Sequence, residues 1–197
     1  MTKLMIASSV VALGLGCGVA GADVLLSNLS SSGTLGWITL GNLGAPSAIG
    51  VSFTMTQNAT LDYATLRLNV GSTATPIVSI WSDSGGLPGT MLYTLTNPVF
   101  STGYNNWSFT APAGSTLSSG STYHLVLQRV AGGTIAWNAG TANATGAGAT
   151  FNTGVKLSGG AWVAQANTPV FELVATPTPG AAALLALGGL ASARRRR

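Results

Sequence analysis

Short runs in which apolar and polar residues alternate fill most of the chain between its two ends. In the run 121–130, Tyr123, Leu125 and Leu127 alternate with a more polar set that includes His124. Successive side chains of a β-strand point to opposite faces, so this period of two predicts half-buried strands. No segment carries the i, i+3, i+4, i+7 pattern of an amphipathic helix over three turns.

Runs of this kind are separated by clusters of Gly, Asn, Ser and Pro at roughly regular spacing. We predict strands at 34–40, 49–55, 61–70, 76–81, 91–96, 106–111, 121–130, 133–137, 148–152 and 170–174. Parallel strands need crossover helices, which the pattern does not offer. The expected fold is therefore all-β, a single antiparallel β-sandwich of jelly-roll-like type over residues 23–175.

One predicted strand and one connection carry local features that the sequence makes specific. In 61–70 the apolar phase slips at Ala64-Thr65, which predicts a β-bulge there. The stretch 82–89, SDSGGLPG, predicts a hairpin connection because glycines permit positive φ and proline fixes its own. Asp83 is expected to cap this loop, in preference to binding calcium or acting as a catalytic acid, because no D-x-D-x-D-G pattern surrounds it.

The N-terminal residues predict export. Lys3 precedes the apolar stretch 4–20, and Ala20-Gly21-Ala22 supplies the small residues of a cleavage site. Residues 1–22 are therefore predicted to be a helical signal peptide. Signal peptidase is the expected partner, and the mature chain would begin at Asp23.

At the other end, 13 uncharged residues from Ala181 to Ala193 precede Arg194, Arg195, Arg196 and Arg197. A helix of that length is about 20 Å long, shorter than the hydrocarbon core of about 30 Å. A retained anchor would be a thinned, tilted span with its arginines on the cytoplasmic side. The alternative is a segment, 176–197, that associates with the inner membrane only until it is processed. The sequence leaves both open.

The net charge of +4 is misleading, because five of the eight basic residues lie in the two ends. Residues 23–175 keep three basic residues against four acidic ones, so their net charge is −1. Nucleic-acid binding draws its affinity from clustered cations, which this segment lacks. We therefore expect no nucleic-acid partner.

Residues that would indicate catalysis are scarce. His124 is the only histidine, and no G-x-S-x-G motif occurs that would supply a nucleophilic serine for it. On the polar face of its strand, His124 is expected to be solvated or hydrogen-bonded. Neither a metal site nor a cofactor is predicted, and the protein is expected not to be an enzyme. A hydrolase would need two carboxylates in one cleft, drawn from Asp23, Asp62, Asp83 and Glu172.

Five tryptophans raise a second possibility, because exposed aromatic faces can stack on sugar rings. Three of them, Trp37, Trp81 and Trp107, lie within strand-like runs, where burial is the default. Trp137 and Trp162 lie nearer to loops and are the candidates for glycan contact. A carbohydrate-binding module is thus the alternative function, and it predicts aromatic rings aligned on one face.

The C-terminal segment resembles the PEP-CTERM sorting signal of exosortase-bearing bacteria. Pro177-Thr178-Pro179-Gly180, the apolar run 181–193 and the four arginines match its three parts in order. The resemblance implies a short apolar helix and an exosortase-like membrane enzyme as partner. It also implies release or attachment at the cell surface. Thr178 departs from the family, which usually has glutamate there.

The body resembles the choice-of-anchor domains that accompany such tails, most closely the R type. The stretches 77–95 and 117–127 carry this resemblance. Proteins with such tails are associated with exopolysaccharide and biofilm production. The resemblance therefore implies an exported cell-surface or extracellular-matrix protein whose sandwich is non-catalytic, with polysaccharide as a further partner.

Overall fold

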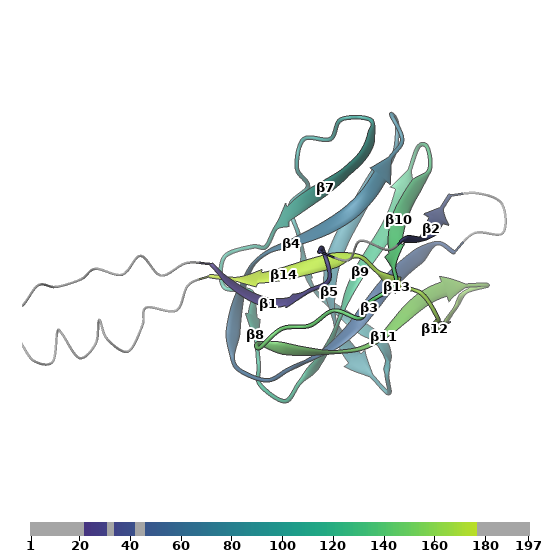
Figure 1. Cartoon of the computed structure of the whole chain (residues 1–197). Helices are drawn as coiled ribbons and strands as arrows, with labels where there is room; N and C mark the ends of the chain where they lie inside the picture. The colour runs from purple at the N-terminus through teal and green to yellow at the C-terminus, as the bar shows by residue number, and fades with distance from the viewer. Residues whose placement is uncertain (1–21, 31–33, 42–45, 177–197) are drawn as a thin grey trace, which may run out of the picture. The chain divides into compact units, whose positions relative to one another are not determined.

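The computed structural model describes residues 22–30, 34–41 and 46–176 (Figure 1). This part of the chain is all-β, and its strands form two antiparallel sheets. No helix that could cross a membrane occurs in these ranges. The predicted N-terminal signal helix and the short C-terminal apolar helix lie outside the described residues.

The eight-stranded sheet is organised around one long strand. It comprises β1 (Asp23–Ser27), β2 (Thr34–Leu40), β4 (Ala59–Val70), β7 (Gly103–Thr110), β8 (Thr116–Leu117), β10 (Ile135–Gly140), β13 (Thr168–Pro169) and β14 (Phe171–Ala175). β7 follows one edge of β4, and the other edge is divided between β14 and β10. β2 pairs with the far edge of β10, so the sheet runs β7-β4-β10-β2 at one end and reaches β1 at the other.

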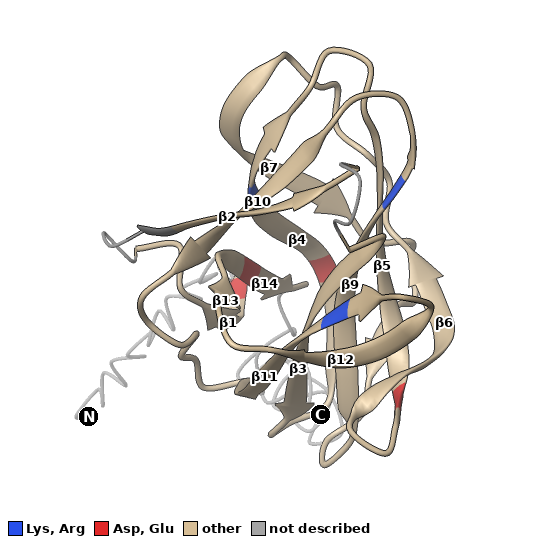
Figure 2. Cartoon of the chain, turned by 90° about the vertical axis from the view of Figure 1, so that its right-hand side faces the viewer, with Lys and Arg blue, Asp and Glu red and all other residues tan. Residues whose placement is uncertain are grey.

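The six-stranded sheet has the order β12-β11-β3-β9-β5-β6. Its strands are β3 (Ala48–Met55), β5 (Thr75–Ser84), β6 (Leu87–Thr94), β9 (Thr122–Ala131), β11 (Ala149–Ser158) and β12 (Ala161–Gln165). β12 and β6 form opposite edges of this sheet and nevertheless approach each other. Figure 2 shows the β11–β12 hairpin passing in front of β9 toward β6. The sheet is therefore curved, and its outer face is concave.

The inner faces of the two sheets pack against each other, as a sandwich requires. The eight-stranded sheet contributes buried residues that include Leu66, Leu68, Phe109, Ile135, Trp137, Phe171 and Leu173. The six-stranded sheet contributes Ile49, Val51, Phe53, Val78, Ile80, Leu125 and Leu127. Each set follows the period of two along its strand, which confirms the alternation predicted for β3, β4 and β9.

The predicted bulge at Ala64-Thr65 is wrong. β4 pairs with β7 in unbroken register from Tyr63 to Val70. The irregularity lies one step earlier: β14 pairs with Tyr63 and then with Leu61, which leaves Asp62 as the extra residue. Leu61 and Ala64 both face the core, so the phase changes between them and Tyr63 turns outward.

The hairpin between β5 and β6 is tighter than the predicted connection 82–89. Leu87 already belongs to β6, so the turn consists of Gly85 and Gly86, with φ of 67° and 86°. A two-residue turn with positive φ at both positions suits the twist of an antiparallel pair. The backbone N–H of Gly86 donates to Oδ2 of Asp83 at 3.0 Å, which confirms that Asp83 caps this loop.

The first and the last strand of the described chain pair with each other. Asp23, the first residue of β1, pairs directly with Ala175, the last residue of β14 (Figure 1). The N–H of Thr176, the next residue, donates to the carbonyl of Thr60 at 2.9 Å. The described strands thus begin and end at one position of the eight-stranded sheet.

Candidate functional site

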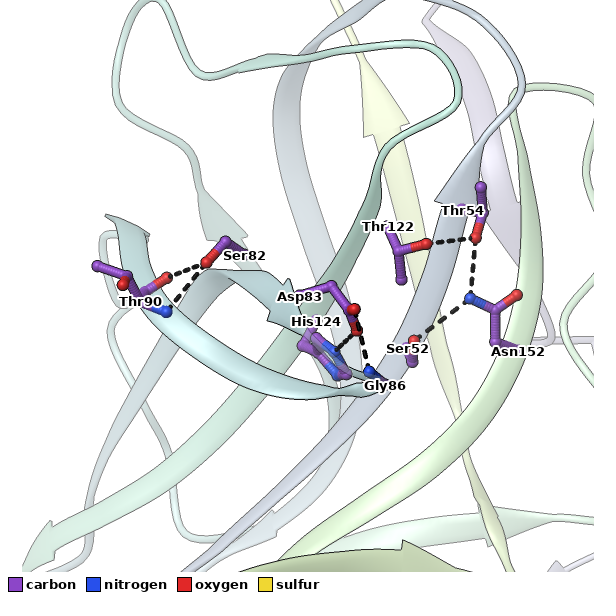
Figure 3. A network of polar contacts seen from close by, with 9 residues as sticks. All are labelled: Ser52, Thr54, Ser82, Asp83, Gly86, Thr90, Thr122, His124 and Asn152. Carbon is purple, nitrogen blue, oxygen red and sulfur yellow. Dashed lines mark hydrogen bonds and ion pairs between the residues drawn. The ribbon is translucent and has the colours of Figure 1, made fainter.

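The only histidine of the chain is held by a carboxylate on the concave face of the six-stranded sheet (Figure 3). His124 lies on β9 between Tyr123 and Leu125, which face the core, so its ring points outward. Its Nε2 is 2.8 Å from Oδ1 of Asp83, yet the exposed fraction of its side chain is 0%. His124 is therefore hydrogen-bonded, as expected, but it is not solvated.

Two tryptophans pack together on the face that carries His124. Trp81 lies directly opposite His124 across β5 and β9. The ring of Trp162, from β12, meets the ring of Trp81 edge to face at a centroid distance of 6.4 Å. Curvature of the sheet brings these two rings together on the face that carries His124.

Burial and pairing act in opposite directions on the two titratable groups. Desolvation lowers the pKa of His124 from 6.5, and the hydrogen bond and charge of Asp83 only partly offset it. Desolvation would raise the pKa of Asp83. The hydrogen bonds from Gly86 and His124 outweigh it, and that pKa is lowered from 3.8. At neutral pH a neutral imidazole donates from Nε2 to an ionised carboxylate.

A separate set of hydrogen-bonded polar side chains lies beside this pair on the same face (Figure 3). Ser52 lies opposite His124 on β3. The amide of Asn152 donates to Oγ of Ser52 at 3.3 Å and to Oγ1 of Thr54 at 3.0 Å. Oγ1 of Thr54 is in turn 2.8 Å from Oγ1 of Thr122. These bonds fix the side chains of three neighbouring strands.

Aspartate, histidine and serine thus lie close together, but their geometry does not match a nucleophilic site. Such a site needs the serine hydroxyl on the histidine nitrogen that faces away from the carboxylate. Within the described residues Nδ1 of His124 has no hydrogen-bond partner. The hydroxyl of Ser52 is bonded to Asn152, and both Ser52 and His124 are buried. The arrangement favours a structural role, in which the hydrogen bonds hold neighbouring strands together.

The remaining acidic residues are spread over the other sheet. Asp62 and Glu172 flank Tyr63, where desolvation first, and then the charges of Glu172 and Asp62, raise the phenol pKa above 10.0. Asp23 lies on the edge strand β1. In the described ranges no three His, Cys, Asp or Glu side chains converge as metal ligands would.

The prediction that Trp137 is available to a glycan is wrong. Its exposed fraction is 0%, and its Nε1 donates to the carbonyl of Val170 at 2.9 Å. β10 lies between β4 and β2, which places Trp137 opposite Leu68 and Ile38 on the core face. Burial among these neighbours removes the ring from solvent.

Trp162, the other predicted glycan contact, is half-buried against Trp81. Trp81 is itself half-buried, and its Nε1 donates to Oγ of Ser79 at 2.8 Å. Trp107 is buried and packs against Phe100. These rings contribute mainly to packing.

The most exposed aromatic pair was not predicted. Trp37 on β2 is 44% exposed and Tyr104 on β7 is 54% exposed. Their ring centroids are 5.2 Å apart, with an interplanar angle of 90°. The sequence did hold a signal: Trp37 alternates with Ile38 and Leu40, so it faces away from the core that they form.

The predicted processing residues are only partly within the structure. Ala22 and Asp23 are described, and both are exposed. Ala20 and the predicted sorting residues, from Pro177 to Gly180 and from Arg194 to Arg197, lie outside the described residues.

Comparison of the chain with protein-family models, with curated proteins and with solved structures found no match.

Proposed function

We propose that this chain is an exported cell-surface or extracellular-matrix protein whose non-catalytic, jelly-roll-like sandwich is sorted through its C-terminal segment. The main observation in support of this proposal is the pairing of Asp23 with Ala175. The predicted signal-peptide cleavage site and the Pro-Thr-Pro motif lie immediately outside this pair. Cleavage at both would leave every strand of the sandwich in place.

Further support comes from the last described residue. The backbone N–H of Thr176 is bonded to Thr60, so the sheet holds the chain up to the residue before Pro177. A membrane enzyme that acts on residues 177–180 would then meet a segment that follows a completed domain. An exosortase-like enzyme is the proposed partner for this step, and signal peptidase is the proposed partner at Asp23.

The non-catalytic character is supported by His124. The sole histidine is buried and bonded to Asp83, and the adjacent serine is bonded elsewhere. General acid–base catalysis needs a group within reach of a substrate proton. A buried imidazole does not meet that need.

Fractionation of the native host tests the sorting proposal. The four arginines would hold the tail in the inner membrane with the positive end in the cytoplasm. Replacing all of Arg194 to Arg197 by glutamine should therefore shift the protein away from the surface fraction, as measured by immunoblot of membrane, surface and medium fractions.

The matched control is the double variant Arg129→Gln, Lys156→Gln, which removes positive charge from the body and leaves the tail intact. It should distribute as the wild type does. Equal distribution of the tail variant and the wild type would refute sorting by this segment. Retention of the wild type in the cytoplasm would refute export.

A further inference from the structure

The outer face of the eight-stranded sheet carries Trp37 and Tyr104, which belong to strands that are not neighbours. β2 and β7 are separated by β10 and β4, and the two rings nevertheless meet at 5.2 Å. The row that runs from Tyr104 across β4 and β10 carries the side chains of Asn69 and Ala136 and ends at Thr39 on β2, one row from Trp37. These side chains are shorter than the two rings, which leaves room for the rings to meet above them. The rings therefore lie over the sheet and expose about half of their surface.

Polar groups beside the rings are held in place by one another. Nε of Arg67 donates to Oδ1 of Asn106 at 3.2 Å, and the guanidinium also bonds the carbonyl of Leu29. In the next row, Oγ1 of Thr65 is 2.9 Å from Oγ of Ser108. Donors and acceptors that are already oriented lose little conformational freedom when a ligand binds.

This combination suits a sugar. Aromatic side chains present an apolar face that can pack on the C–H face of a pyranose ring. Amide, hydroxyl and guanidinium groups supply the donors and acceptors that its hydroxyls require. Asn69 is exposed and lies next to Tyr104 in the register, so its amide is in position for such a bond.

The few charged residues of this face indicate which class of ligand it can bind. The described part of the chain carries few charged residues (Figure 2), and on the central strands of this face Arg67 is accompanied by Glu172 on β14. Nucleic acids and anionic lipids need clustered cations, which a single arginine beside a carboxylate does not provide. The core of a protein interface is a closely packed, more apolar patch, whereas these two rings are surrounded by polar side chains.

We infer that the outer face of the eight-stranded sheet binds a neutral polysaccharide, with Trp37 and Tyr104 as its stacking surface and Asn69 as a hydrogen-bonding group. The inference rests on the sheet and does not depend on the sorting proposal. It also differs from the sequence-based prediction, which named Trp137 and Trp162.

Affinity electrophoresis of the full-length chain tests this inference. Native gels would contain hydroxyethylcellulose, glucomannan, xylan or dextran, with alginate as an acidic polymer and a plain gel as reference. We expect at least one neutral polymer to retard the wild type. Trp37→Ala and Tyr104→Ala should each weaken that binding about tenfold, because each removes one stacking surface. Tyr104→Phe should keep most of it.

Trp162→Ala is the matched control, because it removes an indole from the other sheet. It should bind as the wild type does. Three results would overturn the inference: no neutral polymer retards the wild type, folded Trp37→Ala and Tyr104→Ala variants keep full affinity, or Trp162→Ala alone abolishes binding. Circular dichroism melting verifies that each variant is folded.

A measurement on the unmodified chain covers the case in which the alanine variants do not fold. Limited oxidation with N-bromosuccinimide, mapped by peptide mass, should modify Trp37 before the buried Trp107 and Trp137. The retarding polymer should protect Trp37 and leave the oxidation of Trp162 unchanged. Oxidation of Trp37 at the same rate with and without the polymer would contradict the inference.

Discussion

Nε2 of His124 lies 2.8 Å from Oδ1 of Asp83, although the two residues are 41 positions apart in the chain. The pair joins β9 to Asp83 near the end of β5, two residues before Gly85 of the Gly85-Gly86 turn. Asp83 also accepts the N–H of Gly86, so one carboxylate fixes both the turn and the buried imidazole.

This pair makes stability depend on pH. The pKa of His124 is below 6.5 in the folded state, so the unfolded chain takes up the proton first. The stability that the neutral, buried His124 contributes is fully present above pH 6.5. It is lost as the pH falls from there through the pKa of His124 in the folded state. Asp83 acts in the same direction at lower pH, because its pKa is below 3.8 when folded. Urea unfolding at pH 8.0, 6.5 and 5.0 should show a decreasing free energy of unfolding.

His124→Gln is the control for this pH dependence, because glutamine can still donate to Asp83 but does not titrate. Its free energy of unfolding should be lower than that of the wild type at pH 8.0 and should change less between pH 8.0 and 5.0. A wild type that becomes more stable as pH falls through this range would show that the sign is wrong.

We expect the two tryptophans on the concave face to contribute to the lowered pKa of His124. Desolvation is the largest cause of its lowered pKa. Trp162 packs against Trp81, the residue opposite His124. We expect Trp162→Ala to raise the pKa of His124 toward 6.5, as followed by NMR titration of the single histidine. Trp37→Ala, on the other sheet, should leave that pKa unchanged. An unaltered pKa of His124 in Trp162→Ala would mean that other groups shield the imidazole from solvent.

Asn28 is a buried residue on which the segment after β1 depends. Its Nδ2 donates to the carbonyls of Ala142 and Pro169 at 3.2 Å each, and its Oδ1 accepts from the N–H of Phe171 at 2.8 Å. Asn28→Ala would leave these backbone groups unpaired. It should reduce the free energy of unfolding by about 3 kcal/mol in a urea titration.

Asn58→Ala is the matched control for that substitution. Asn58 is exposed, and its Oδ1 accepts one bond, from the N–H of Ser119 at 2.8 Å. The loss there should be less than about 1 kcal/mol, because water can replace the amide. If the two variants were destabilised equally, the network of Asn28 would not contribute as described.

The strand pattern could be predicted from the sequence because it depends on local alternation. Each predicted strand overlaps a strand of the structure, and 34–40 coincides with β2. β1, β8, β12 and β13 were missed, and β8 and β13 consist of two residues each. β1 is short and adjoins the predicted signal peptide, and its apolar residues Val24, Leu25 and Leu26 do not alternate. β12 is a short edge strand, whose pairing with β11 decides its conformation.

The functional faces depend on partners that are distant in the sequence. Trp137 ends the predicted strand 133–137 and was expected to lie near a loop, but strands on both sides bury it. The contact between Trp37 and Tyr104 requires knowledge that β10 and β4 lie between their strands. The link from His124 to Asp83 follows from the register of β5 on β9. Alternation within one strand holds none of this information.

The intact mass of the protein recovered from the surface and medium fractions tests the central claim most directly. Processing at both ends predicts a product that begins at Asp23 and ends between Pro177 and Gly180, with all described strands retained. The Thr178→Glu variant, which restores the residue usual in the family that the tail resembles, should yield the same product at least as completely. A mature protein that still carries Arg194 to Arg197 would contradict the account and identify the apolar segment as a retained anchor.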